Sequence, residues 1–271
     1  MSDPIHEDHT ADPGWLQRGI LRFSLAMTFL TRVPLRIPES VTPEDLRASM
    51  GWYPLVGLGL GALGWLAYAA CVPLFSPLLT AALVIVLLEG ITGALHLDGV
   101  MDTCDGIGSG AERERALEIM KDSRVGAMGV FGAIAIVLVK VLALASVEPS
   151  RVGSVLLLSW MAGRSLPVWS ATLFPYARPA GTGGAFAGGG AAWARIQSTL
   201  IAFAAAWLIG GWTGCVAVTL AAASVLAIQS RIARRLGGLT GDVYGMGIEL
   251  TETAVLLFGC LIAPLSQLLR S

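Results

Sequence analysis

The feature that most constrains the fold is a series of long apolar runs. A membrane-spanning helix needs about 20 mostly apolar residues, and such runs occur at 51–73, 77–95, 127–146, 152–174, 196–212, 213–230 and 250–269. Mean hydropathy is +0.70 and 55% of the 271 residues are hydrophobic, more than a soluble domain of this length needs. Within lipid these runs must be helices, because only then are their backbone groups satisfied. The sequence predicts an all-α, polytopic helical membrane protein with about seven transmembrane helices.

The N-terminal region departs from this pattern. Residues 1–14 are acidic and contain His and Pro, which predicts a flexible tail before a single integral-membrane domain over 15–271. Residues 15–38 are only partly apolar, with arginines near both ends and Pro34 inside. We expect an interfacial or re-entrant helix there. The two runs within 196–230 should form a tight hairpin that turns at residues 210–214, where three glycines lie.

The basic residues predict an orientation. If the segment 96–126 faces the cytoplasm and each later run crosses once, Arg151 and Arg270 lie outside, and Lys140 and Arg164 lie within spans. The other fourteen are cytoplasmic: Arg18, Arg22, Arg32, Arg36, Arg47, Arg113, Arg115, Lys121, Arg124, Arg178, Arg195, Arg231, Arg234 and Arg235. Cytoplasmic loops carry such an excess of basic residues. We expect a multi-pass protein of the bacterial cytoplasmic membrane, and the net charge of −1 gives no indication of a nucleic-acid partner.

Charged residues are unusually dense between His96 and Gly126, in the stretch HLDGVMDTCDGIGSGAERERALEIMKDSRVG. If Asp98, Asp102 and Asp105 continue the preceding helix, their spacing places three carboxylates within an arc of about 60°. Carboxylates this close repel one another unless a cation lies between them. Oxygen ligands favour Mg²⁺ or Mn²⁺ over zinc. A solvated acidic helix end at the membrane surface is the alternative interpretation.

Glycines of the first run form the string GLGLGALG at residues 57–64. The string is similar to a dinucleotide-binding fingerprint, but no strand precedes it and its context is a membrane helix. Small residues that allow two helices to approach closely explain it better.

Two later stretches contain further polar candidates. Tyr176 and Arg178 precede the glycine-rich segment 181–190, where Arg178 could clamp a phosphate, although such segments are also ordinary linkers. Asp242 precedes a predicted helix start, and Glu249 and Glu252 lie on one face of that helix. The two glutamates either serve the site or pair with arginines of the preceding helix: Arg231, Arg234 and Arg235.

Three ionisable residues lie within the apolar runs themselves: Glu89, Lys140 and Arg164. Ionisable groups at membrane depth are costly and usually face a polar interior. Glu89 should point toward the same cavity as Asp98 if their helix is straight. Lys140 and Arg164 could instead extend toward the membrane surface.

The order of these motifs resembles the cobalamin synthase family, also called adenosylcobinamide-GDP ribazoletransferase. The resemblance rests on LHLDGVMDTCDGIGSG, ALEIMKDSRVGAMG and GDVYGMGIELTE, with FLTRVPL, GWYPLVG and YARPAGTGGAF in support. It covers nearly the whole chain. Val100, Met101 and Cys104 depart from the residues that are common in the family, but no acid is lost.

The resemblance implies a late step of vitamin B12 nucleotide-loop assembly. The enzyme would join α-ribazole, or its 5′-phosphate, to adenosylcobinamide-GDP and release GMP with Mg²⁺, for which Mn²⁺ could substitute. Metal ions and positioned cations suit such a transfer, because charge develops on the phosphoryl group and on departing GMP.

On this interpretation the candidate residues fall into three groups. The metal ligands are Asp98, Asp102 and Asp105, with Asp242 and Glu249 as additional candidates. The phosphate- and substrate-binding candidates are Lys121, Arg124, Arg178, Tyr176 and His96. The general base that takes the proton of the ribazole hydroxyl is left open among Asp105, Asp122 and Glu252.

Three rival functions compete with this interpretation. Another membrane phosphotransferase, with a nucleotide-activated donor and a lipid alcohol acceptor, is the closest in mechanism. A transporter would use the intramembrane charges, but the acids gather at one membrane face and no inverted repeat is visible. A non-catalytic scaffold would not need three aligned carboxylates. Partners other than the substrates and the bilayer are not indicated, and homo-oligomerisation is left open.

Overall fold

The computed structural model describes residues 14–38, 41–178 and 192–268, with side chains described up to Leu261. The predicted tail and the glycine-rich segment 181–190 therefore lie outside the described residues, apart from Gly14. The described elements are α1 (Trp15–Leu30), α2 (Pro43–Ser49), η1 (Met50–Trp52), α3 (Tyr53–Cys71), α4 (Pro77–Thr92), α5 (Leu95–Gly108), α6 (Arg113–Ile119), α7 (Ala127–Ser146), η2 (Pro149–Arg151), α8 (Val152–Leu173), α9 (Ala192–Leu236) and α10 (Gly241–Leu268). An isolated bridge joins Tyr176 to Leu239.

The predicted helical membrane fold is confirmed. Four described helical segments are long and apolar enough to cross a membrane, at 43–71, 127–146, 192–236 and 241–261. A fifth is added if the bent pair of α4 and α5 is one span. This number is below the predicted seven. Part of the difference arises because α9 joins two of the predicted runs, and because α8 is not among the segments that are long and apolar enough.

The predicted hairpin coincides with a break inside α9. Gly211 has φ 58° and ψ −147°, a conformation that ends regular helix and that glycine adopts without steric cost. A Cβ atom added at Gly214 would lie 2.5 Å from the carbonyl oxygen of Ala206. The two halves of α9 therefore approach each other closely at the break, as the predicted turn requires.

The chain also bends sharply before the acidic motif. Gly93 and Ala94 both have left-handed backbones, with φ of 65° and 54°, and the axes of α4 and α5 differ by 90°. Arg32 stabilises the bend, because its backbone N–H donates to the carbonyl oxygen of Ile91 at 2.7 Å. The expectation of one straight helix through Glu89 and Asp98 is therefore wrong.

Close helix packing explains the glycines of α3. A Cβ atom at Gly57 would meet the carbonyl oxygen of Trp160, and one at Gly61 would lie 2.7 Å from that of Leu156, both on α8. Any larger residue would force α3 and α8 apart. The interpretation of these glycines as a helix-packing surface is confirmed.

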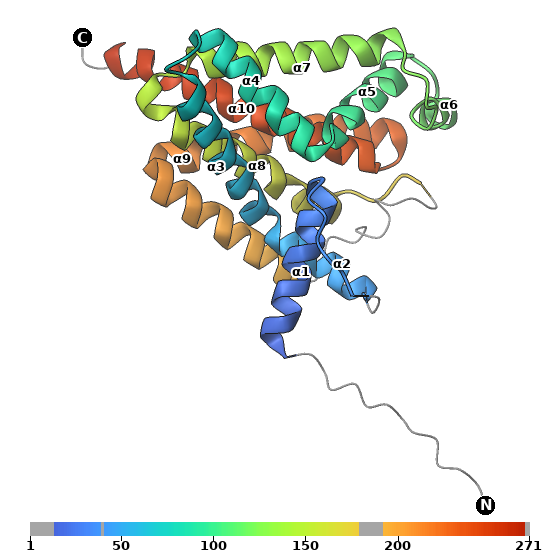
Figure 1. Ribbon diagram of the computed structural model, residues 1–271. Coiled ribbons are helices and arrows are strands. Elements are labelled where there is room, and N and C mark those ends of the chain that lie inside the picture. The colour runs from blue at the N-terminus through green and yellow to red at the C-terminus, as the bar shows by residue number, and fades with distance from the viewer. Residues whose placement is uncertain (1–13, 39–40, 179–191, 269–271) are drawn as a thin grey trace, which may run out of the picture.

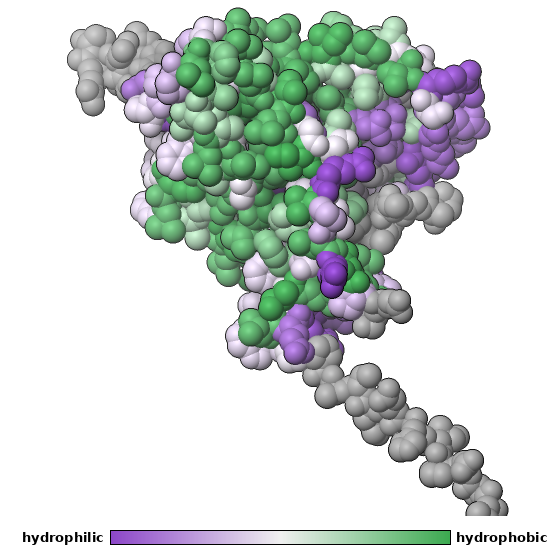
Figure 2. Space-filling view, viewed as in Figure 1, coloured by the Kyte–Doolittle hydropathy of each residue, from purple (hydrophilic) through white to green (hydrophobic). Residues whose placement is uncertain are grey.

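Helix α10 occupies the centre of the molecule and contacts α5, α7, α8 and α9 (Figure 1). Hydrophobic residues cover most of the face in Figure 2, and hydrophilic residues gather at the edge where α6 lies. Large exposed apolar side chains occur on α4, α7 and α9, including Val86, Phe131 and Leu208. Such a surface is typical of a protein surrounded by lipid. Helix α1 has 16 residues, fewer than a regular span needs.

Candidate active site

The two acidic stretches meet where α5 and α10 cross. A Cβ atom at Gly99 would lie 2.5 Å from the carbonyl oxygen of Asp242, and one at Gly245 would lie 3.3 Å from Cα of His96. Glycine at these positions allows the two backbones to touch. The first turn of α10 therefore carries Asp242 to the helix that holds Asp98 and Asp102.

Asp102 is the electrostatic centre of this group. Its half-buried carboxyl group lies within electrostatic range of the carboxylates of Asp242, Asp98 and Asp105, and of the guanidinium of Arg178. Within the described chain, the side chains of Asp98 and Asp102 accept no hydrogen bond. These carboxylates are therefore available as ligands for a cation.

Arg178 ties the group to α10. Its Nη2 atom donates to Oδ2 of Asp242 at 2.8 Å, and the hydroxyl of Thr240 donates to the same oxygen at 3.1 Å. Thr240 also accepts a hydrogen bond from the backbone N–H of Val243. Thr240, and not Asp242 as expected, therefore caps the start of α10.

Asp105 has a structural role of its own. Its two carboxylate oxygens accept hydrogen bonds from the backbone N–H groups of Gly126 at 2.6 Å and Gly129 at 2.7 Å. These N–H groups belong to the start of α7, where a negative charge is stabilising. The third acid of the triad thus joins α5 to α7, and it lies within electrostatic range of Asp102.

Asp122 is exposed and bound to Arg124. Its carboxylate accepts hydrogen bonds from Nε at 3.0 Å, from Nη2 at 2.6 Å and from the backbone N–H of Arg124 at 3.0 Å. These bonds lower the pKa of Asp122 to about 2. A carboxylate of such low basicity is a weak proton acceptor.

The predicted site residues line three neighbouring cavities. Lys121, Tyr176 and Arg178 line a cavity of about 410 Å³ beside α6. A second cavity, of about 290 Å³, lies between α5 and the start of α7 and is lined by Asp105, Asp122 and Arg124. His96, Asp98 and Asp242 line a third, of about 360 Å³, which extends between α1, α8 and α10.

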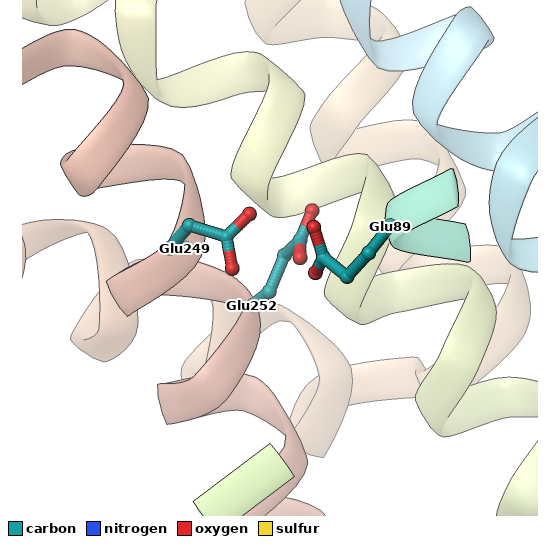
Figure 3. A group of neighbouring side chains, drawn as sticks. All are labelled: Glu89, Glu249 and Glu252. Carbon is teal, nitrogen blue, oxygen red and sulfur yellow. The ribbon is translucent and has the colours of Figure 1, made fainter. Parts of the chain in front are cut away.

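Glu249 and Glu252 lie in a buried ion cluster. Nζ of Lys140, which has no exposed side-chain surface, donates to Glu249 at 2.5 Å, to Glu252 at 2.6 Å and to Glu89 at 3.0 Å. Arg164 donates to the other oxygen of Glu252. The three carboxylates point toward one another in Figure 3.

Both glutamates are ion-paired in the structure. Their cations come from α7 and α8, and not from the arginines at the end of α9 that the structural explanation named. Arg231, Arg234 and Arg235 are exposed, and Arg235 donates to the carbonyl oxygen of Ala111. The sequence contained one signal for this pairing: Lys140 and Arg164 carry the opposite charge to the glutamates and lie, like them, within apolar runs.

The donor set near Asp102 suits a hard divalent cation. Mg²⁺ usually binds one or two carboxylates and completes its shell with waters and substrate phosphates. Asp102 and Asp242 supply two such carboxylates, and Asp242 is bound by Arg178, which lines the cavity beside α6. Among the described residues, the one trio of acids whose oxygens all lie within 4.8 Å of one another is Glu89, Glu249 and Glu252. Lys140 already occupies that trio with its ammonium group.

Comparison with known proteins identifies the family. A family model described as cobalamin-5-phosphate synthase matches residues 22–260. The chain belongs to this family. The cobalamin-5-phosphate synthase resemblance that the motifs indicated is confirmed, and with it the prediction of a transferase of cobalamin biosynthesis.

Several curated members of the cobalamin-5-phosphate synthase family are similar over most of their length. The adenosylcobinamide-GDP ribazoletransferase of Brevibacillus brevis is 42% identical over 87% of this chain and 96% of its own. That of Desulfitobacterium hafniense is 41% identical over 86% and 94%, and that of Pseudomonas fluorescens 39% identical over 88% and 98%. No solved structure matches the chain.

Proposed function

We propose that the protein joins α-ribazole, or its 5′-phosphate, to adenosylcobinamide-GDP and releases GMP in a Mg²⁺-dependent reaction. The observation that carries this proposal is the meeting of Asp98, Asp102 and Asp242 beside the basic cavity of Arg178. The curated relatives are named for this activity, and the chain is similar to them over almost their full length. We further propose that the site faces the cytoplasm of a bacterial inner membrane, because the basic residues concentrate on that side.

The basic cavity is suited to the pyrophosphate of the donor. Arg178 is held in place by its bond to Asp242 and lines the cavity. A guanidinium that is fixed in this way binds phosphate oxygens with defined geometry. Lys121 adds a second cation at the same cavity, and Tyr176 adds a ring beside it.

Asp102 and Asp242 would hold the Mg²⁺, which when bound neutralises the charge that develops on the transferred phosphoryl group and on GMP. In the transfer, the acceptor hydroxyl oxygen bonds to the phosphorus next to cobinamide, and the bond from that phosphorus to the GMP oxygen breaks. The hydroxyl proton must leave to a base. Asp98 lines the cavity beside the two proposed ligands and has a free carboxylate.

The earlier candidates for this base are less suitable. Glu252 is buried and bound by Lys140 and Arg164, Asp122 is bound by Arg124, and Asp105 accepts two backbone N–H groups. In each of these acids the carboxylate oxygens are already engaged by cations or backbone N–H groups, so they are poorly placed to meet the acceptor hydroxyl. We therefore assign the base to Asp98.

Purified protein, adenosylcobinamide-GDP and α-ribazole test the proposal when GMP release is followed with Mg²⁺ and after its removal. We expect release only with both substrates and the metal. Asp98→Asn should abolish turnover, whereas Glu148→Gln, which alters an exposed acid at η2, should not. Absence of release from the well-folded wild-type protein, or equal release with a lipid alcohol in place of α-ribazole, would contradict the proposal.

A further inference from the structure

The cavity of about 360 Å³ beside Asp98 has features that phosphate chemistry does not use. It lies between α1, α3, α5, α8 and α10, and side chains such as Leu30, Met50 and Ile248 make most of its wall apolar. Its size is at the lower end of the range for small-molecule sites. The cobinamide macrocycle is far too large for it.

Polar atoms in the wall lack partners. Nε2 of His96 and the hydroxyl oxygen of Tyr244 are buried and make no hydrogen bond within the described chain, although the two residues are only 3% and 7% exposed. Oγ1 of Thr28 is also buried without a hydrogen-bond partner in the described chain. Buried polar groups are almost always satisfied, by protein, water or ligand. All three residues line the cavity, so its wall contains polar groups that the described chain does not satisfy.

An aromatic surface forms part of the same wall. The rings of Phe29 and Tyr53 stack with centroids 6.1 Å apart and an interplanar angle of 14°, and both residues line the cavity. Flat apolar walls with a small number of hydrogen-bonding groups suit a heteroaromatic ring that has few polar atoms. Guanine has polar groups around most of its edge, so much of that edge would be left unpaired here.

We propose that this cavity binds the benzimidazole base of the acceptor nucleoside, with one ring nitrogen hydrogen-bonded by Tyr244 or His96. This inference rests on the proposed function and names the acceptor subsite within it. Asp98 and Asp242 both line the cavity, and Asp242 is one of the two proposed metal ligands. A base held inside directs the ribose hydroxyl toward Asp98, while the donor phosphates lie on the Arg178 side of Asp242.

Two variants test the subsite by direct binding of α-ribazole to the purified full-length protein. Tyr244→Phe keeps the ring and removes the hydroxyl, and we expect the Kd for α-ribazole to rise by about three- to tenfold. Leu95→Trp adds bulk to the cavity wall from a partly exposed position, so binding should fall further. Tyr68→Phe is the matched control, because Tyr68 is also a buried tyrosine of a membrane helix but does not line the cavity.

The KM values separate the acceptor from the donor. We expect the KM for α-ribazole to rise in both cavity variants while the KM for adenosylcobinamide-GDP stays at the wild-type value. An unchanged Kd for α-ribazole in both variants, or a rise confined to the donor KM, would overturn the inference while wild-type GMP release still supports the proposed function. Absence of GMP release from the wild type would instead refute the proposed function itself.

Discussion

Replacing Lys140 by Met should destabilise the protein strongly, although the residue lies outside the proposed active site. The side chain has no exposed surface, and its ammonium group binds three carboxylates at 2.5, 2.6 and 3.0 Å. Met has a similar length but no charge, so Glu89, Glu249 and Glu252 would share only Arg164. Removing one partner from a buried ion pair costs about 3–5 kcal/mol. Because three carboxylates lose their shared cation, the loss of stability should lie at the upper end of that range.

Thermal unfolding in detergent measures the effect. For a chain of this size a loss near 5 kcal/mol corresponds to a fall in Tm of roughly 10–20 °C. Arg115→Gln is the control, because it removes one cation from an exposed pair with Glu118 and should hardly change the Tm.

A second variant separates charge from packing. Adding Glu249→Gln to Lys140→Met removes one of the stranded carboxylates, so the double variant should be more stable than the single one. A wild-type Tm in Lys140→Met, or a double variant less stable than the single one, would refute the assignment of this cluster as a structural ion network.

Three further outcomes follow from the topology, the charge at Asp122 and the packing of α3. A cysteine at Ser109 in a cysteine-free variant should be protected from an impermeant thiol reagent in intact cells, whereas one at Ser150 should react; labelling at Ser109 would reverse the topology. Because Arg124 lowers the pKa of Asp122 to about 2, Asp122 stays ionised as pH falls from 7 to 4. Asp122→Asn should therefore leave the acid limb of the pH–rate profile unchanged, and a shift of that limb would identify Asp122 as a base. Gly61→Val should destabilise the protein by about 1–3 kcal/mol and so lower its Tm, because the added side chain would collide with the α8 backbone; an unchanged Tm would contradict the close packing.

The helical membrane fold could be predicted because each apolar run must satisfy its own backbone groups. The position of α7 agrees with its run to the residue. The bend at Gly93 and Ala94 could not be predicted in the same way, since alanine rarely adopts a left-handed backbone. It depends on tertiary contacts such as the Arg32 hydrogen bond.

The parts of the candidate site that depend on residues close together in the sequence could be predicted. The spacing of Asp98, Asp102 and Asp105 places them on one helix, and that helix is α5. The partners of Glu249 and Glu252 depend on how α10 packs against α7 and α8, which no local pattern contains. The capping of α7 by Asp105 is likewise a contact between segments more than 20 residues apart.

The central claim is that Asp102 and Asp242 hold the catalytic Mg²⁺ while Glu249 belongs to the structural cluster. A Mg²⁺ titration of GMP release in Asp102→Asn and Glu249→Gln tests it most directly. We predict that Asp102→Asn raises the Mg²⁺ concentration for half-maximal activity and lowers turnover by roughly 10²–10⁴. Glu249→Gln should keep the wild-type Mg²⁺ requirement and lose thermal stability. A wild-type titration in Asp102→Asn, or a raised Mg²⁺ requirement in Glu249→Gln, would contradict the account.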